Sequence, residues 1–180
     1  MTAPHAELFG RMTRGALIEG AYRYRLVRQW SGGERDRRML CWLMLNPSTA
    51  DGSVDDPTIR RCCSFAMLWG YDGIIVVNLF AYRATDPAAL WRASAGGIDT
   101  IGGPTTDLVI EGAVRSSATT IYGWGAHGRL CQYRAHDVDS AIRVCHGVEP
   151  LCLGLTKGGH PRHPLYVASN TAPVAYAGVP

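Results

Sequence analysis

Four short apolar runs indicate buried β-strands. They cover residues 39–45, 74–79, 119–122 and 150–155. Residues 39–45 and 74–79 are apolar at nearly every position, which fits central strands covered on both faces. An earlier segment, residues 20–30, instead alternates aromatic and aliphatic positions with arginines, including Arg23 and Arg25, which is typical of a half-buried strand. The turn at residues 31–34 predicts that this segment and the 39–45 run form an antiparallel hairpin.

Helical periodicity fills the intervals between the later strands. A helix is expected from Pro57, with Asp55 and Asp56 as cap and dipole partners, and it should end at Gly70. Further helices are expected over residues 105–115 and 130–145. The fold class predicted is α/β: a three-layer α/β/α sandwich with a central, mainly parallel four-stranded sheet and an N-terminal antiparallel strand or hairpin. We expect a single domain over residues 1–180, with its core at about 20–170.

Polar or conformationally special residues follow each apolar run. These motif stretches are residues 45–51, 77–83, 121–125 and 160–165. Ligands of open α/β sheets bind in the crevice outside the carboxyl ends of the strands. The four stretches therefore predict one pocket assembled from four loops.

The first motif stretch supplies an amide and a carboxylate. Asn46 has both a donor and an acceptor with which to orient a water or read a base edge, but a turn at Asn46 and Pro47 is the simpler explanation. Asp51, Asp55 and Asp56 follow closely. A carboxylate there can act as a general base, and helix capping explains Asp55 or Asp56 at least as well.

The second and third motif stretches offer an amide, an arginine and an aromatic ring. Asn78 interrupts an otherwise apolar strand, and a buried amide needs partners from a ligand or from a neighbouring backbone. Arg83 fits either a phosphate contact or a surface charge. Trp124, between two glycines, can stack on a flat ligand or belong to the core, and the core is the simpler assignment.

The last motif stretch carries two histidines. His160 and His163 each precede a proline and lie in a loop with Lys157, Arg162 and two glycines. Because histidine titrates near neutral pH, we expect at least one of the two to act as an acid, a base or a charge stabiliser. Metal binding is the minor alternative.

Composition narrows the classes of protein. The chain has 180 residues, 47% of them apolar, and a formal net charge of +3, which does not demand a polyanionic partner. Seventeen of its eighteen basic residues are arginine, whose planar fork suits phosphates and base edges. Nucleotide bias in the source genome is the simpler explanation of that excess.

Cysteine usage and hydropathy point to an intracellular location. The six cysteines include no C-x-x-C pair, so reduced, buried thiols are favoured over a zinc or iron–sulfur site. No apolar run is long enough to span a bilayer, and no signal peptide opens the chain. We expect a cytoplasmic monomer with no membrane contact, no metal and no cofactor.

The motifs resemble two known families. The region from about residue 39 to 166 closely resembles a bacterial and phage family known as domain of unknown function 1643. The strings that carry this resemblance are Leu-Asn-Pro-Ser-Thr-Ala-Asp, Asp-Asp-Pro-Thr, Asn-Leu-Phe-Ala and Pro-Arg-His-Pro-Leu-Tyr. The order of Asn46-Pro47, Asn78-Leu79, Trp124-Gly125 and the loop from His160 also looks like the uracil-DNA glycosylase superfamily.

The glycosylase resemblance implies a role for each motif. Asn46, helped by Asp51, would position the attacking water. Asn78 would read the edge of an extruded base, and His160 or His163 would stabilise charge on the departing base. Trp124 and Pro47 would complete the base site. The implied contacts to DNA or its phosphates are Ser48, Arg83, Lys157, Arg162 and Tyr166.

Some positions depart from the glycosylase pattern. The usual glycine before the first motif is Met44 or Leu45 here, and Ser48 and Thr49 replace an expected aromatic. Asn46 stands where the most active members carry a carboxylate, which predicts slower water activation or a different reaction.

The sequence thus predicts a DNA glycosylase-like enzyme that hydrolyses the N-glycosidic bond of an extruded uracil or modified base, in repair or phage defence. One alternative is a hydrolase or transferase acting on a free nucleotide, nucleoside or RNA in the same pocket. Another is a non-catalytic module that binds nucleic acid or a modified base. An enzyme acting on DNA should have a positive groove. Candidates for its rim are Arg60, Arg61, Arg83, Arg129 and Arg162.

Overall fold

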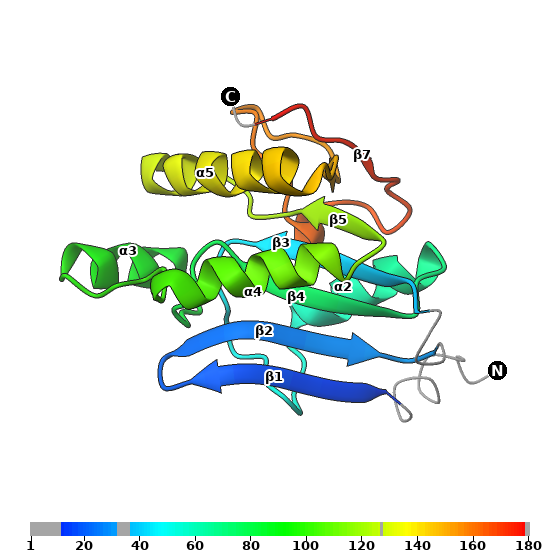
Figure 1. Cartoon of the computed structure of the whole chain (residues 1–180), viewed down its shortest axis with the longest axis horizontal. Coiled ribbons are helices and arrows are strands. Elements are labelled where there is room, and N and C mark those ends of the chain that lie inside the picture. Colours follow the sequence, from blue (N-terminus) through cyan, green and yellow to red (C-terminus); the bar gives the residue numbers. More distant parts are fainter. Residues whose placement is uncertain (1–11, 32–36, 127, 179–180) are drawn as a thin grey trace.

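A seven-stranded sheet runs through the protein in the order β1-β2-β4-β3-β5-β6-β7 (Figure 1). The computed structural model describes residues 12–31, 37–126 and 128–178, and the side chains of 128–130 are excluded. The strands are β1 (Thr13–Glu19), β2 (Tyr22–Gln29), β3 (Met39–Met44), β4 (Gly73–Asn78), β5 (Thr119–Tyr122), β6 (Leu151–Cys152) and β7 (Val174–Ala175).

The centre of the sheet is parallel and its edges are antiparallel. β4, β3, β5 and β6 form the parallel block. β1 and β2 continue it antiparallel on one side, and β7 does so on the other. The prediction of a mixed α/β protein with a largely parallel central sheet is confirmed, but the sheet has seven strands rather than four.

The predicted hairpin between residues 20–30 and 39–45 is wrong. β2 pairs with β1 on one side and with β4 on the other, so β4 separates it from β3. The hairpin forms instead between β1 and β2, through a turn in which Gly20 has a φ of 55°. The apolar β3 lies between two parallel neighbours, which bury both of its faces and satisfy both of its edges.

Helices cover both faces of the sheet (Figure 1). Alternate residues of β3 divide two hydrophobic cores: Trp42 packs with α2 on one face, whereas Leu43 packs with the other helices on the opposite face. No described helix is long and apolar enough to cross a membrane. The helices are α2 (Pro57–Leu68), α3 (Pro87–Ala95), α4 (Gly103–Arg115), α5 (Gly128–His146) and the 3-10 turn η1 (Pro164–Tyr166).

Helix α2 begins as its sequence predicts. Pro57 occupies the first turn, and the Asp56 carboxylate accepts a hydrogen bond from the backbone N–H of Ile59 at 2.8 Å. Asp55, the other candidate cap, forms ion pairs instead. The helix is followed by Gly70 in the left-handed region, with a φ of 77°. Capping therefore fixes where α2 starts, just after the first motif stretch.

Two arginines of β2 are buried, and the burial of Arg23 departs from the simple alternation of the strand. Arg23 is 2% exposed and Arg28 is fully buried. Leu17 lies opposite Arg25 and Ile18 lies opposite Arg23, so β2 contains one extra residue, Tyr24, at this point. Such a bulge changes the face of the residues beyond it. It places Arg23 on the same face as Arg28, toward the loop that precedes α2.

The Arg28 side chain ties that loop to the sheet. Its Nε donates to Asp55 Oδ1 at 2.7 Å, and its Nη2 donates to the Asp51 carbonyl at 2.6 Å. Arg14 adds a second ion pair to Asp55 at 3.0 Å. Both partners of the Arg28–Asp55 pair are almost fully buried. Breaking such a pair leaves an uncompensated charge in the interior.

We therefore expect Asp55→Ala to destabilise the protein strongly. The loss should be about 3–5 kcal/mol in the free energy of unfolding, because Arg28 remains buried without its carboxylate. Urea denaturation of the purified protein measures this. Asp137→Ala, at an exposed position of α5, is the matched control and should change stability by less than about 0.5 kcal/mol. A loss below about 1 kcal/mol for Asp55→Ala would contradict the assigned role.

Candidate functional site

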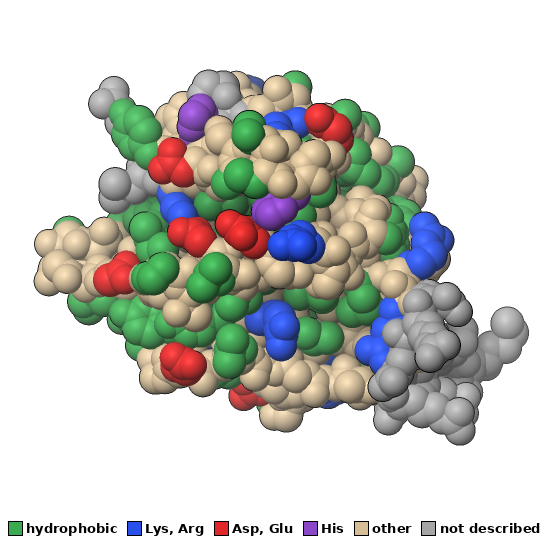
Figure 2. Space-filling view, viewed as in Figure 1, with side chains coloured by type: hydrophobic (Ala, Val, Ile, Leu, Met, Phe, Trp, Pro, Cys, Tyr) green, Lys and Arg blue, Asp and Glu red, His purple; other side chains and the backbone are tan. Residues whose placement is uncertain are grey.

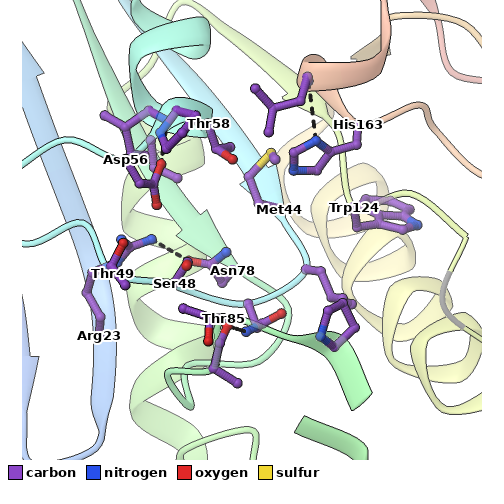
Figure 3. A pocket seen from close by; sticks show the side chains of 18 of the residues that line it. Arg23, Met44, Ser48, Thr49, Asp56, Thr58, Asn78, Thr85, Trp124 and His163 are labelled. Carbon is purple, nitrogen blue, oxygen red and sulfur yellow. Dashed lines mark hydrogen bonds between the residues drawn. The ribbon is translucent and has the colours of Figure 1, made fainter. Parts of the chain in front are cut away.

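A cavity of about 330 Å³ lies at the carboxyl ends of β3 and β4 (Figure 3). All four motif stretches contribute side chains to it, as do β2 and the start of α2. Its polar lining residues are Arg23, Asn46, Ser48, Thr49, Asp56, Thr58, Asn78, Thr85, His163 and Tyr166. The structure thus brings together residues that lie more than a hundred positions apart in the sequence, because the strands that precede them are neighbours in one sheet.

Asn78 is held in one orientation by Arg23. Asn78 is 2% exposed, and its Oδ1 accepts a hydrogen bond from Arg23 Nη2 at 3.2 Å. Arg23 Nη1 is in turn fixed by the Ala50 carbonyl at 3.0 Å. Because a guanidinium can only donate, the amide nitrogen Nδ2 must point away from Arg23. None of the described residues accepts a hydrogen bond from Nδ2, which leaves this donor for a ligand (Figure 3).

Arg23 is a buried charge on the cavity wall. It forms no ion pair within the described part of the chain, and its Nε is buried without a hydrogen-bond partner. Burial lowers the pKa of Arg23 to about 10, and the negative charge of Asp56 partly opposes this shift. A buried charge without a paired counterion is costly. The cavity therefore favours a ligand that carries negative charge or electron-rich oxygen atoms.

Of the two histidines in the last loop, His163 lines the cavity and His160 does not. His163 precedes η1, and its Nδ1 accepts a hydrogen bond from the backbone N–H of Leu165 at 3.3 Å. In the neutral ring the proton must then be on Nε2. The backbone N–H of His160 donates to the Thr156 hydroxyl, and its Nδ1 is buried without a partner among the described residues.

The predicted water-positioning residues, Asn46 and Asp51, are both engaged in local structure. Asn46 lines the cavity, but its Nδ2 donates to the carbonyls of Ala84 at 2.7 Å and Pro47 at 3.1 Å. This joins the first motif loop to the loop after β4. Asp51 is not part of the cavity wall. Its Oδ1 accepts three hydrogen bonds from Ser53 and Val54, and these lower the pKa of Asp51 to about 2.

The carboxylate that does line the cavity is Asp56. Its Oδ1 caps α2, and its Oδ2 has no hydrogen-bond partner among the described residues. The Asp-Pro pair at 56–57 is enough to identify a helix cap from sequence. It does not reveal that this cap faces the pocket, because that depends on how α2 packs on the sheet. Arg23 was missed for a related reason, since the bulge in β2 reverses its expected face.

A second, more open hollow of about 400 Å³ adjoins the cavity. The two share Ser48, Thr49, Ala84 and Thr85, and the second one adds Arg83. The three shared hydroxyl groups form no hydrogen bond with the part of the chain that the structure describes. The Nε of Arg83 is also buried without a partner there. Hydroxyls and a guanidinium with unused donors are the groups that hold phosphates.

The remaining predicted residues lie around or outside these hollows. Trp124 lines the cavity but is fully buried and packs on Tyr122, with ring centroids 4.6 Å apart. Tyr166 lines the rim and is 81% exposed. The residues outside both hollows are Pro47, Lys157, His160, Arg162 and Asp51, and the Arg129 side chain lies outside the described residues.

The arginines expected on the rim of a groove do not all line the hollows. Arg61 is engaged with the last loop, donating to the carbonyls of Pro164 and Val167. Arg60 is exposed and donates to the Asp55 carbonyl. Arg83 alone of this set lines either hollow. In the described residues, no three histidine, cysteine or acidic side chains are grouped as metal ligands would be.

Comparison with known proteins places most of the chain in one family. The family described as "Protein of unknown function (DUF1643)" matches residues 23–165. No curated protein matches the chain. No solved structure matches it either. The matched region includes every strand of the parallel block and every residue named above as lining the cavity except Tyr166.

The environment of Asp51 makes a pH-dependent prediction. Its carboxyl should titrate at a pKa of about 2 rather than 3.8, because the charged form accepts hydrogen bonds from Ser53 and Val54. A depressed pKa means that ionised Asp51 stabilises the turn above pH 3.8 and that this contribution disappears as the pH falls through about 2. NMR titration of the carboxyl, with amide exchange at Ser53 and Val54, measures both effects. A carboxyl that titrates at its ordinary value would contradict the structure.

Proposed function

The chain belongs to the DUF1643 family, and we propose that it is a DNA glycosylase-like enzyme that hydrolyses the N-glycosidic bond of an extruded base. One observation carries this proposal. A cavity lined by an oriented amide and a histidine shares a wall with a second hollow lined by hydroxyls and an arginine. The amide and histidine suit the base of a nucleotide, and the hydroxyls and arginine suit its neighbouring phosphate. The substrate class is a nucleotide within a DNA strand.

The cavity suits a base that presents a carbonyl oxygen. Asn78 Nδ2 offers a donor in a fixed direction, and Arg23 holds it there. Met44, Ile59 and Val76 add apolar surface against which a flat ring can lie. A site built to hydrogen-bond one edge discriminates strongly against bases that lack the matching acceptor. Asn78 is therefore the residue expected to select the base.

His163 and Arg23 suit the departure of a base as an anion. Breaking an N-glycosidic bond leaves the electron pair on the base, and preorganised donors or positive charges lower the barrier to this step. The imidazole of His163 lines the cavity, and the charge of Arg23 acts through the Asn78 amide. The low exposure of Arg23 strengthens its effect, because little water screens it.

The second hollow and the rim suit a strand rather than a free base. Ser48, Thr49, Thr85 and Arg83 would hold a phosphate beside the extruded nucleotide. Leu165 and Tyr166 line the rim and are 39% and 81% exposed, so they are available to fill the gap that a flipped base leaves in a duplex. By contrast, the face formed by α4 and α5 carries interspersed acidic and basic side chains, and its described residues form no continuous basic surface (Figure 2).

A second candidate function is recognition of the base without turnover. It is favoured by Asn46, which occupies the position where the glycosylase resemblance puts a carboxylate and whose amide nitrogen is bound to two carbonyls. Such a module would bind the extruded base in the same cavity. It would differ from the enzyme in releasing no product.

The first test is release of free base from a panel of oligonucleotides. The panel carries uracil, hypoxanthine, mismatched and hypermodified bases in single and double strands, and mass spectrometry detects the product. We expect release of one base, with a rate at least about 100-fold lower for His163→Asn. Asparagine can still accept the Leu165 N–H bond, so this variant removes the ring but keeps the turn.

Two outcomes would count against this assignment. Binding of one oligonucleotide without release would favour the second candidate function. Undiminished release by His163→Asn would remove His163 from the mechanism while leaving the proposed reaction in place.

The phosphate hollow makes an independent prediction about salt dependence. Arg83→Gln should weaken binding to oligonucleotides of every sequence and reduce the slope of log Kd against log salt by about 1, because one phosphate contact is lost. Arg115→Gln is the matched control, since Arg115 ends α4 and lines neither hollow. Fluorescence anisotropy across a salt series measures both variants. An unchanged slope for Arg83→Gln would contradict the phosphate assignment.

A further inference from the structure

We infer that Asp56, the cap of α2, is the general base that activates the attacking water. This inference rests on the proposed function and names a catalytic residue for it. The resemblance of the first motif to glycosylases points instead to Asn46, helped by Asp51. Neither of these provides an available carboxylate in the cavity, whereas Asp56 does.

The other nearby acids are already committed. Asp51 points into its own turn, where Ser53 and Val54 use its Oδ1. Asp55 is 8% exposed and is shared between Arg14 and Arg28. Asp56 is the one carboxylate among the described residues that lines the cavity. If a carboxylate of this chain takes the proton of the attacking water, its position selects Asp56.

The capping bond orients Asp56 for this task. Oδ1 is held by the Ile59 N–H at 2.8 Å, which fixes the plane of the carboxylate and leaves Oδ2 without a partner among the described residues. Figure 3 shows the carboxylate directed from the start of α2 toward the part of the cavity where Arg23 and Asn78 lie. A fixed carboxylate with one unused oxygen is suited to accept a proton from a bound water.

Arg23 and Asp56 interact across a gap. The charge of Asp56 opposes the effect of burial on Arg23, yet the two form no ion pair within the described residues. Opposite charges that line one cavity without touching leave room between them for water or substrate. An ion pair in direct contact would instead have occupied both groups.

The reaction balances with these groups alone. The water oxygen attacks C1′ of the sugar as Asp56 takes one of its protons, and the bond between C1′ and the base nitrogen breaks. The electron pair of that bond leaves with the base. The base anion then takes up one proton from solvent, and Asp56 gives the proton that it took to solvent. The carboxylate is restored, and the products are the free base and an abasic sugar.

Capping alone does not require an acid at this position. Asparagine and serine cap helices about as well as aspartate does. Helix α3 offers a direct comparison, because Asp86 caps it through a bond to the Ala88 N–H at 2.9 Å and lines neither hollow. A substitution that keeps the cap but removes the ionisable group therefore separates structure from catalysis.

The experiment compares Asp56→Asn, Asp56→Ser and the control Asp86→Asn with the unaltered protein. It measures single-turnover base release, oligonucleotide Kd and Tm. We expect both Asp56 variants to lose at least about 100-fold in rate. Their Kd should stay within about twofold of the unaltered protein and their Tm within a few degrees, since the cap persists. Asp86→Asn should change none of these values.

The pH–rate profile gives a readout that a structural role would not move. The Asp56→Asn variant should lose the acidic limb of the pH–rate profile that the unaltered protein shows. The charged groups facing Asp56 are Arg23 from β2 and His163 from the last loop, while the adjacent Asp55 is neutralised by Arg14 and Arg28. His163→Asn distinguishes a limb due to the imidazole from one due to Asp56.

Each outcome decides the inference. A rate within about threefold of the unaltered protein for Asp56→Asn would overturn it and leave the proposed function standing. Loss of binding together with rate in both Asp56 variants would also overturn it, since Asp56 would then serve to position the substrate. Absence of base release by the unaltered protein would overturn the proposed function and this inference together.

Discussion

The site depends on two buried arginines of β2, Arg23 and Arg28, that hold the loop preceding α2 against the sheet. Arg28 binds Asp55 and the Asp51 carbonyl, and Arg23 binds the Ala50 carbonyl. These bonds set the position of the loop and therefore of the α2 start, which carries Asp56 to the cavity. The two arginines differ in one respect: Arg28 is fully paired, whereas Arg23 has no counterion among the described residues. The ion pair of Arg28 stabilises the loop before α2, and the unpaired charge of Arg23 makes the cavity electrostatically positive at that point.

Two capping residues also line the cavity. Asp56 uses one carboxylate oxygen to cap α2, and His163 uses one ring nitrogen to cap η1. Both Asp56 and His163 line the cavity, so each capping bond holds a side chain of the cavity wall. The capping bond therefore fixes the orientation of each side chain in the cavity wall. Caps of this kind explain how a short chain can bring a carboxylate, an imidazole and an amide to one cavity.

Several features could be predicted from the sequence for clear local reasons. Continuous apolar runs identified β3 and β4, and Asp-Pro identified the start of α2. The predicted hairpin partner of β2 was wrong. A turn predicts that the chain reverses, but not that another strand, here β4, lies between the two strands in the sheet. The alternating pattern predicted that Arg23 is exposed, and this prediction was wrong because a one-residue bulge is not visible in such a pattern. Asp51, a reasonable candidate by spacing, stabilises its own turn.

Most strands and helices, and the loops that carry polar groups, follow from local patterns in the amino-acid sequence, because periodicity, caps and turns depend on neighbours along the chain. Which of these groups meet in one place depends on how the elements pack in the folded protein. The order β4-β3-β5 brings Asn46, Asn78, Trp124 and His163 to one cavity, and the bulge in β2 adds Arg23. The packing of the loops also leaves His160 and Asp51 outside that cavity. Strand order and bulges depend on pairing between distant segments, which no local pattern encodes.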